Sequence, residues 1–131
     1  MKKILIADDS EFVHHICKAR LAHCKHYVIL SAMNGHDAYS ILLREDKIDL
    51  IILDLNMPLM NGIEFMKKMC VDNSYKHTPV IILSTDADEG KMQLLRDLGV
   101  WAFVEKSKTH NFNNIVADAI ARNPSPLLEY H

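Results

Sequence analysis

The sequence predicts an α/β protein in which five helices cover a sheet of five parallel strands. The first support is a set of short apolar runs, at residues 4–7, 50–53, 80–83 and 101–104. Continuous apolar runs of this length are typical of strands that are buried on both faces. The second support is that stretches with apolar residues at helical spacing lie between these runs, which predicts alternating strands and helices.

The N-terminal part of the chain contains two predicted strand–helix pairs. A strand at about residues 3–8 is followed by a helix at residues 11–24. The apolar stripe of this helix is expected to contain Phe12, Ile16, Ala19 and His23. A second strand at residues 27–30 leads through the turn Asn34-Gly35 into a second helix. The apolar residues of that helix are Ala38, Ile41 and Leu42.

The same alternation predicts three further pairs. The third strand ends at Asp54, and Met57-Pro58 with Asn61-Gly62 form the loop before the third helix. Pro79 precedes the fourth strand, Gly99 stops the fourth helix, and Pro124 follows the fifth helix. The apolar faces of these three helices are expected to contain Ile63, Met66, Met69, Met92, Leu95, Leu98, Phe112, Ile115, Val116, Ala119 and Ile120.

The length of 131 residues suits one domain with a sizeable core. Short connections predict right-handed crossovers, and the natural closure of a (βα)5 chain is a doubly wound, flavodoxin-like parallel sheet in strand order 2-1-3-4-5. The predicted domain spans residues 1–123. Residues 124–131 are interpreted as a C-terminal tail or as the start of a linker.

Composition argues against binding to nucleic acid or to a membrane. The net charge of -2 provides no basic footprint, and no apolar stretch approaches the ~20 residues of a membrane span or forms a signal peptide. Cys17, Cys24 and Cys70 have no C-x-x-C spacing, which indicates free thiols in a reducing compartment. We therefore expect a cytoplasmic protein, in which Cys17 and Cys24 pack rather than form a redox pair.

Three carboxylates are expected at one edge of the sheet. Asp8 and Asp9 follow the first strand, and Asp54 follows the third. In open parallel sheets, ligands bind at the carboxyl ends of the strands. Three carboxylates at one place repel one another unless a cation is present, and hard oxygen ligands suit Mg²⁺. Asp8 and Asp9 can share a metal only if the chain has begun to turn, because successive strand residues face opposite ways.

These residues resemble the receiver domain of two-component response regulators, over about residues 3–122. The motifs that carry the resemblance are Asp8-Asp9, Ala32-Met33-Asn34-Gly35, Asp54-Leu55-Asn56-Met57-Pro58, Asn61-Gly62, Ser84, Phe103 and Lys106. The intervals between Asp9, Asp54, Ser84 and Lys106 are 45, 30 and 22 residues, which match the family spacing. The ordered set, with each member at its own strand end, is highly specific, and the chain resembles single-domain regulators of the chemotaxis or phosphorelay type.

The resemblance implies a signalling switch rather than an enzyme, with self-phosphorylation and autodephosphorylation as its only chemistry. Asp54 would accept a phosphoryl group from a phosphohistidine of a sensor kinase or a histidine phosphotransfer protein. Asp9, Asp54 and the backbone carbonyl of Asn56 would hold Mg²⁺ directly, and Asp8 would bind it through water. Lys106 would place a compact positive charge on the phosphoryl group.

The resemblance also implies how the signal leaves the site. The Ser84 hydroxyl and the Thr85 N–H would donate to phosphoryl oxygens, and Phe103 would rotate inward behind Ser84. This movement would reshape the face formed by helix 4, strand 5 and helix 5, where a downstream protein or a second copy docks. Asn56 and Asp86 would tune the lifetime of the phosphorylated state.

The sequence departs from the family pattern around the fifth strand. Ser107 stands where proline normally follows the lysine. A cis Lys106-Ser107 bond costs ~2.5–4 kcal/mol, so a strained cis bond and a trans bond in an altered loop both stay open. Trp101 is either exposed on the docking face or packed against the fourth helix, and Thr85 stands where alanine is common. The histidines of the first helix and its exit are interpreted as surface residues rather than metal ligands; they are His14, His15, His23 and His26.

Two other functions stay open at this point. The chain can be the receiver part of a larger regulator whose output domain binds DNA or performs catalysis. It can also be a phosphatase with an aspartate nucleophile. That second class usually carries an Asp-x-Asp loop after the first strand, whereas Asp8-Asp9 is followed by Ser10.

Overall fold

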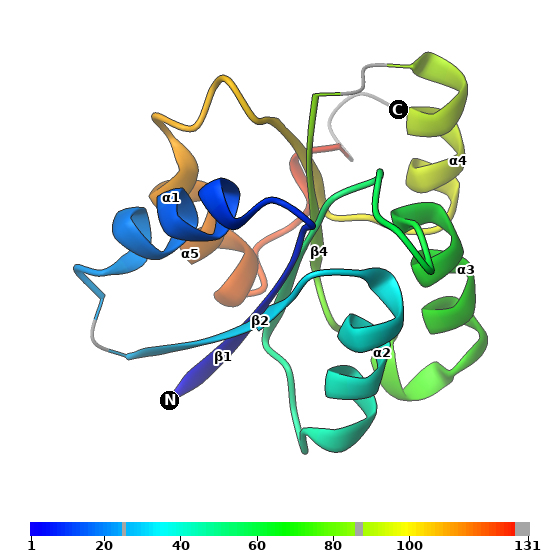
Figure 1. The fold of residues 1–131 in the computed structure, drawn as a ribbon, viewed down its shortest axis with the longest axis horizontal. Helices are drawn as coiled ribbons and strands as arrows, with labels where there is room; N and C mark the ends of the chain where they lie inside the picture. The colour runs from blue at the N-terminus through cyan, green and yellow to red at the C-terminus, as the bar shows by residue number, and fades with distance from the viewer. Residues whose placement is uncertain (25, 86–87, 128–131) are drawn as a thin grey trace.

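Strands and helices alternate along the chain as the sequence predicts (Figure 1). The computed structural model describes residues 1–24, 26–85 and 88–127. Its strands are β1 (Lys2–Ala7), β2 (Tyr27–Ala32), β3 (Leu50–Leu53), β4 (Val80–Ser84) and β5 (Ala102–Glu105). Its helices are α1 (Glu11–Leu21), α2 (Gly35–Arg44), α3 (Gly62–Val71), α4 (Glu89–Asp97) and α5 (Phe112–Ile120), with a short 3₁₀ helix η1 (Asn73–Tyr75). Among the described residues, every helix is too short or too polar to cross a membrane.

The five strands form one parallel sheet in the order β2-β1-β3-β4-β5, which confirms the predicted topology. Helices α1 and α5 cover one face of this sheet, and α2, α3 and α4 cover the other (Figure 1). β3 lies in the centre with all four of its residues buried, whereas β2 and β5 form the two edges. The carboxyl end of β3 is therefore the middle of the edge at which a ligand site is expected.

The core consists of two apolar clusters, one on each face of the sheet. Alternate strand residues point to opposite faces. Leu5, Ile51 and Ile82 accordingly belong to the cluster under α2, α3 and α4. The neighbouring strand residues belong to the cluster under α1 and α5; they include Ile4, Ile52 and Ile81. Helix residues missed by the sequence analysis complete this core, above all Phe65 in α3, which is fully buried.

The predicted buried face of α1 is wrong. Phe12 is 71% exposed, Ala19 and His23 are exposed, and the helix ends at Leu21 rather than at residue 24. The residues that α1 buries are His14, Cys17 and Leu21. Apolar spacing alone missed this face because its first member is a polar residue, His14, which makes a hydrogen bond within the core.

The glycines of the two Asn-Gly motifs allow a close contact beside β3. A Cβ at Gly35 would overlap the carbonyl of Met60, and a Cβ at Gly62 would overlap the carbonyl of Asp54. The Gly35 N–H donates to the Met60 carbonyl at 3.0 Å, and the Gly62 N–H donates to the Leu55 carbonyl at 3.0 Å. The starts of α2 and α3 therefore hold both ends of the loop that follows Asp54.

We predict that Gly35→Ala lowers the free energy of unfolding by about 2–4 kcal/mol, because the added methyl group meets rigid backbone. Gly90→Ala in α4 is the matched control. Its Cβ would meet Asp88 Oδ1 at 3.2 Å, which is a side-chain atom rather than backbone. The control should be neutral or more stable by up to ~1 kcal/mol, as expected for alanine in a helix. Urea unfolding followed by circular dichroism measures both, and equal stabilities of the two variants would contradict the close contact.

Candidate functional site

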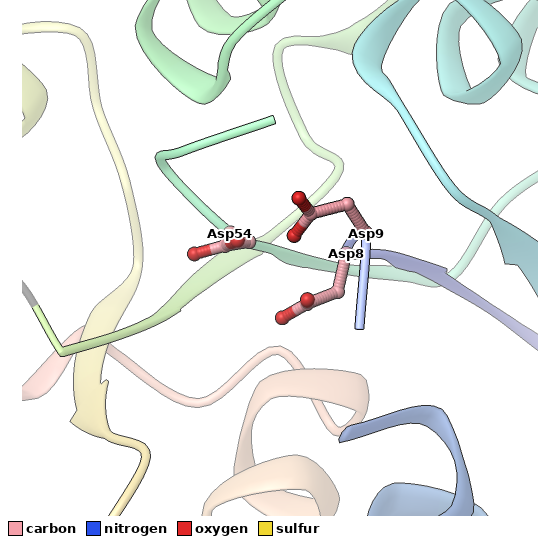
Figure 2. A group of neighbouring side chains, drawn as sticks. All are labelled: Asp8, Asp9 and Asp54. Atoms are coloured by element: carbon pink, nitrogen blue, oxygen red, sulfur yellow. The ribbon is translucent and has the colours of Figure 1, made fainter. Parts of the chain in front are cut away.

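Three aspartates meet where β1 and β3 end, and these two strands are hydrogen-bonded neighbours (Figure 2). One carboxylate oxygen from each of Asp8, Asp9 and Asp54 lies within 4.8 Å of the others. Asp8 is 1% exposed and Asp54 is 4% exposed, whereas Asp9 is exposed to solvent. Asp8 and Asp54 therefore form the buried part of the pocket, and Asp9 lies at its solvent-exposed side.

The chain turns directly after β1, which lets two consecutive aspartates reach the same site. β1 ends at Ala7, and the Ser10 N–H donates to Asp8 Oδ1 at 2.8 Å. From the opposite side, the His14 ring donates from Nε2 to the carbonyl of Asp8 at 2.8 Å, since a carbonyl only accepts. Ser10 also caps α1 by accepting from the Val13 N–H. Together these contacts fulfil the geometric condition for Asp8 and Asp9 to share a ligand.

Lys106 lies across the site from these strands. It follows β5, and its Nζ reaches to 2.9 Å from Asp8 Oδ2 and 3.4 Å from Asp54 Oδ1. Burial by itself lowers the pKa of Lys106, but the contacts with Asp8 and Asp54 outweigh burial and raise the pKa above its usual value. The contact between Lys106 and Asp8 Oδ2 is an ion pair, and Asp8 Oδ2 is buried with no other partner among the described residues.

Burial of Asp54 and the nearby charge of Asp8 raise the pKa of Asp54 above its usual value. Lys106 and the Leu55 N–H, which donates to Asp54 Oδ1 at 2.9 Å, act in the opposite direction without cancelling this effect. One ammonium thus faces three carboxylates, and the site lacks positive charge.

The donor set fits a hard divalent cation. Carboxylate oxygens are the ligands that such cations prefer, and Asp8 Oδ2 is a buried acceptor without a hydrogen-bond donor. Within the described ranges, this is the one group of three or more acidic, histidine or cysteine side chains close enough to hold a metal ion. Among the described residues, no histidine belongs to such a group. The interpretation of His14 as a surface residue is wrong, because His14 is 5% exposed.

The other predicted site residues lie at the end of β4, in β5 and in the loop after β3. Ser84 is the last residue of β4 and is buried, and Thr85 follows it on the surface. Asn56 is exposed in the loop after Asp54. Phe103 lies half-buried in β5, with the Arg96 guanidinium 5.6 Å from its ring centre. Asp86 lies outside the described residues.

The two alternatives left open near β5 are decided by the structure. The Lys106-Ser107 bond is trans, as are the peptide bonds of the described residues generally. Trp101 is partly buried on the α1/α5 side of the sheet rather than against α4, and its indole N–H donates to the Asn123 carbonyl at 3.0 Å. β5 starts at Ala102, one residue later than predicted, so that Trp101 precedes the strand.

The sequence analysis missed two residues that shape the site. His14 was missed because its partner is a backbone carbonyl, which leaves no signal in a pattern of side chains. Arg96 was missed because its contact with Phe103 joins two elements, α4 and β5, whose distance depends on the folded chain. The role of Gly62 beside Asp54 was signalled by the Asn61-Gly62 motif.

This chain is similar to proteins of bacterial signalling. Residues 4–117 match the family described as response regulator receiver domain. A chemotaxis protein CheY homolog from Campylobacter jejuni is 31% identical over 107 residues, which cover 82% of each chain. The sensory/regulatory protein RpfC of Xanthomonas campestris is 30% identical over 106 residues, which cover 79% of this chain and 14% of RpfC. The structure of the chemotaxis response regulator CheY4 of Vibrio cholerae has a TM-score of 0.81 and 28% identity, covering 91% of this chain and 98% of CheY4.

We predict that Asp54→Asn stabilises the protein in the presence of a metal chelator, with a rise in Tm of several degrees at neutral pH. Because the pKa of Asp54 is raised in the folded state, its neutral form favours folding. That contribution is complete below the usual aspartate pKa of about 4 and is lost as the pH rises through the raised value. The advantage of the variant should therefore vanish at low pH.

Thermal unfolding at several pH values measures this difference. Asp46→Asn, at an exposed aspartate, is the matched control and should behave as wild type. An Asp54→Asn variant that is less stable than wild type at neutral pH would contradict the raised pKa of Asp54 in the folded protein.

Proposed function

We propose, since the chain belongs to the response regulator receiver domain family, that Asp54 is the residue at which this signalling switch is phosphorylated. Receiver domains are phosphorylation-activated switches of two-component systems, not classical enzymes, and they accept the phosphoryl group from histidine kinases. Beyond this family-level function, we propose which aspartate is phosphorylated, which cation binds in the pocket and which face of the domain contacts the downstream protein.

The observation that carries this proposal is the unequal engagement of the two buried carboxylates. Both oxygens of Asp8 have a partner, since Oδ1 accepts from the Ser10 N–H and Oδ2 forms an ion pair with Lys106 at 2.9 Å. Asp54 Oδ1 accepts from the Leu55 N–H, whereas no described residue donates a hydrogen bond to Asp54 Oδ2. Asp54 also lies at the end of the central strand, so its free oxygen is the best-placed nucleophile in the pocket.

In the proposed transfer, Asp54 Oδ2 attacks the phosphorus of a phosphohistidine on a sensor kinase or a histidine phosphotransfer protein. The O–P bond forms as the N–P bond breaks, and the leaving imidazole nitrogen keeps the bonding electron pair and takes up a proton. Lys106 lies 3.4 Å from Asp54 Oδ1, near enough for its ammonium to move from the carboxylates to the oxygens of the incoming group.

Mg²⁺ is the cation that we propose for this site. Asp9, Asp54 and the Asn56 carbonyl would hold it directly, and Asp8 would hold it through water. When bound, such an ion supplies positive charge to the acceptor and phosphoryl oxygens. The excess of carboxylates over ammonium in the pocket supports this assignment.

The same chemistry limits the lifetime of the signal. An aspartyl phosphate is a mixed anhydride, which water hydrolyses, and acetyl phosphate has the same bond type and is a suitable small donor. We assign self-phosphorylation and autodephosphorylation to this pocket and no turnover of other substrates. The exposed side chain of Asn56, two residues beyond Asp54, would control the approach of water, together with Asp86.

Output is proposed to pass through β4 and β5. Ser84 ends β4 beside Lys106, whose N–H donates to the Ser84 carbonyl at 3.2 Å. The hydroxyl of Ser84 and the N–H of Thr85 would donate to phosphoryl oxygens, and Phe103 would then rotate inward. Because Arg96 of α4 lies over the Phe103 ring, this rotation would change the contact between β5 and α4. A downstream protein or a second copy would dock on the α4–β5–α5 face.

One comparison favours a second architecture for the native protein. RpfC carries a segment similar to this chain within a protein several times longer. The same switch would then control an output domain joined after residue 123 instead of a separate protein. The length of the native gene decides between the two, since an output domain requires a coding region that continues well beyond this domain.

We predict that incubation with Mg²⁺ and acetyl phosphate adds one phosphoryl group to the wild-type protein and none to Asp54→Asn. Intact-mass spectrometry measures the addition. Asp46→Asn is the matched control and should be modified like wild type, and a chelator should abolish the reaction. Modification of Asp54→Asn to the wild-type extent would overturn the assignment of the acceptor, and failure of all proteins would mark the site as inactive.

We predict that the double variant Asn56→Ala, Asp86→Ala changes the rate of autodephosphorylation, because the positions two residues beyond Asp54 and Ser84 are proposed to tune the access of water. The decay of the phosphorylated species, followed by mass after removal of the donor, gives this rate. An effect of about tenfold corresponds to 1.4 kcal/mol in the barrier for hydrolysis. A decay rate equal to that of wild type would show that neither residue sets the lifetime.

A further inference from the structure

The chain does not leave the domain at the end of α5. Residues 123–127, the C-terminal strap, return to β5, which is an edge strand of the sheet. The Trp101 indole N–H donates to the Asn123 carbonyl at 3.0 Å, and the Ser125 hydroxyl donates to the Trp101 carbonyl at 2.6 Å. Ser125 Oγ also accepts from the Leu127 N–H at 3.1 Å. In Figure 1 the red end of the described chain accordingly lies against the sheet between α5 and α4.

The C-terminal strap crosses the sheet edge from one layer of the protein to the other. It starts at Asn123, beside Trp101, whose ring packs against the cluster under α1 and α5. It reaches Leu127, which packs against the opposite cluster, as does Phe103. Leu127 and Phe103 also line the same cavity. The strap therefore covers the part of the α4–β5–α5 face that contains the proposed switch residue.

The contact between the strap and this face is partial. A cavity of about 510 Å³ that opens to solvent is lined by Trp101, Phe103 and Ile115 of the face and by Pro124, Pro126 and Leu127 of the strap. Three strap residues, Asn123, Pro124 and Pro126, are exposed. An exposed segment held by few hydrogen bonds opens at low cost.

We propose that the C-terminal strap, residues 123–127, is a reversible cover that occupies the output face in cis and competes there with a protein partner or a second copy. Two features of the face make a cover useful: β5 has an unpaired edge, and Trp101 and Phe103 add apolar surface. The occupant is the chain's own segment because that segment is already seated on the face through hydrogen bonds to Trp101.

The regulatory meaning of the cover rests on the proposed function. If phosphorylation of Asp54 turns Phe103 inward, the surface that packs with Leu127 changes, and the cover is weakened. A partner then gains access to the β5 edge in the phosphorylated state. The cover itself is a property of the unphosphorylated chain and can be tested without phosphorylation.

The first test uses full-length variants and Trp101, the single tryptophan of the chain, as the probe. Leu127→Glu places a charge against the apolar face and should release the cover, so that Trp101 emission shifts to the red and acrylamide quenches it faster. Leu43→Glu is the matched control, because Leu43 is 59% exposed on α2. Identical emission and quenching of wild type and both variants would overturn the proposal.

The second test adds a synthetic peptide with the sequence of residues 123–131. This peptide should bind Leu127→Glu and restore its blue emission. It should bind wild type at least about tenfold more weakly, because the tethered segment competes at a high effective concentration. Equal affinity for the two proteins, or binding to neither, would overturn the cover in cis. A wild-type dimer that Leu127→Glu converts to a monomer in sedimentation would instead show that a second copy supplies the segment, which also overturns it.

The third test separates the cover from the proposed function. Wild type is treated with Mg²⁺ and acetyl phosphate, and both mass and Trp101 quenching are recorded. A gain of one phosphoryl group with faster quenching supports release of the cover, whereas a gain without any change in quenching overturns the coupling and leaves the function intact. Absence of the mass gain contradicts the proposed function, and the peptide experiment still decides the existence of the cover.

Discussion

The charge balance between three carboxylates and one ammonium is the constraint on which the rest of the site depends. Asp8, Asp9 and Asp54 bring their oxygens within 4.8 Å of one another, and Lys106 contacts Asp8 and Asp54 from the far side of the sheet edge. Burial of Asp54, together with the nearby charge of Asp8, keeps the pKa of Asp54 raised even though the Lys106 ammonium acts in the opposite direction. A pocket with surplus negative charge attracts a cation, and a cation prepares it for a phosphoryl group. The fold thus maintains an unfavourable arrangement that binding relieves.

Local contacts keep this arrangement in place from three directions. His14 and Ser10 fix the turn after β1, so that both aspartates of a consecutive pair reach the pocket. Gly62 lets α3 begin against the Asp54 carbonyl, which orients the loop that carries Asn56. β5 connects the pocket with the outer face, because Lys106 follows its end, Phe103 lies in its middle and Trp101 precedes its start. A displacement of this short strand would therefore change both the position of Lys106 in the acidic pocket and the surface under the C-terminal strap.

The elements that the sequence predicted well are those whose signal is local. Apolar runs in the sequence predicted the buried strands. The rule that parallel strands end at the same edge of a sheet then predicted that the acidic residues after these strands lie together. The prediction for α1 failed because apolar spacing selected Phe12, whereas the folded helix buries His14 on the strength of one hydrogen bond to a backbone carbonyl. The expectations for Trp101 were incomplete for a similar reason, since its partners, Asn123 and Ser125, lie more than twenty residues away in sequence.

The sequence by itself determined the strand–helix alternation, the sheet order, the family and the acidic residues, because each is written in spacing and residue type at short range. Only the tertiary structure decided which carboxylate Lys106 approaches most closely and which face of α1 is buried. It also decided that the Lys106-Ser107 peptide bond is trans and that the chain returns to β5 after α5. These features depend on contacts between residues that are distant in sequence. Their energies are set by burial and by hydrogen bonds that exist only once the sheet has brought those residues together.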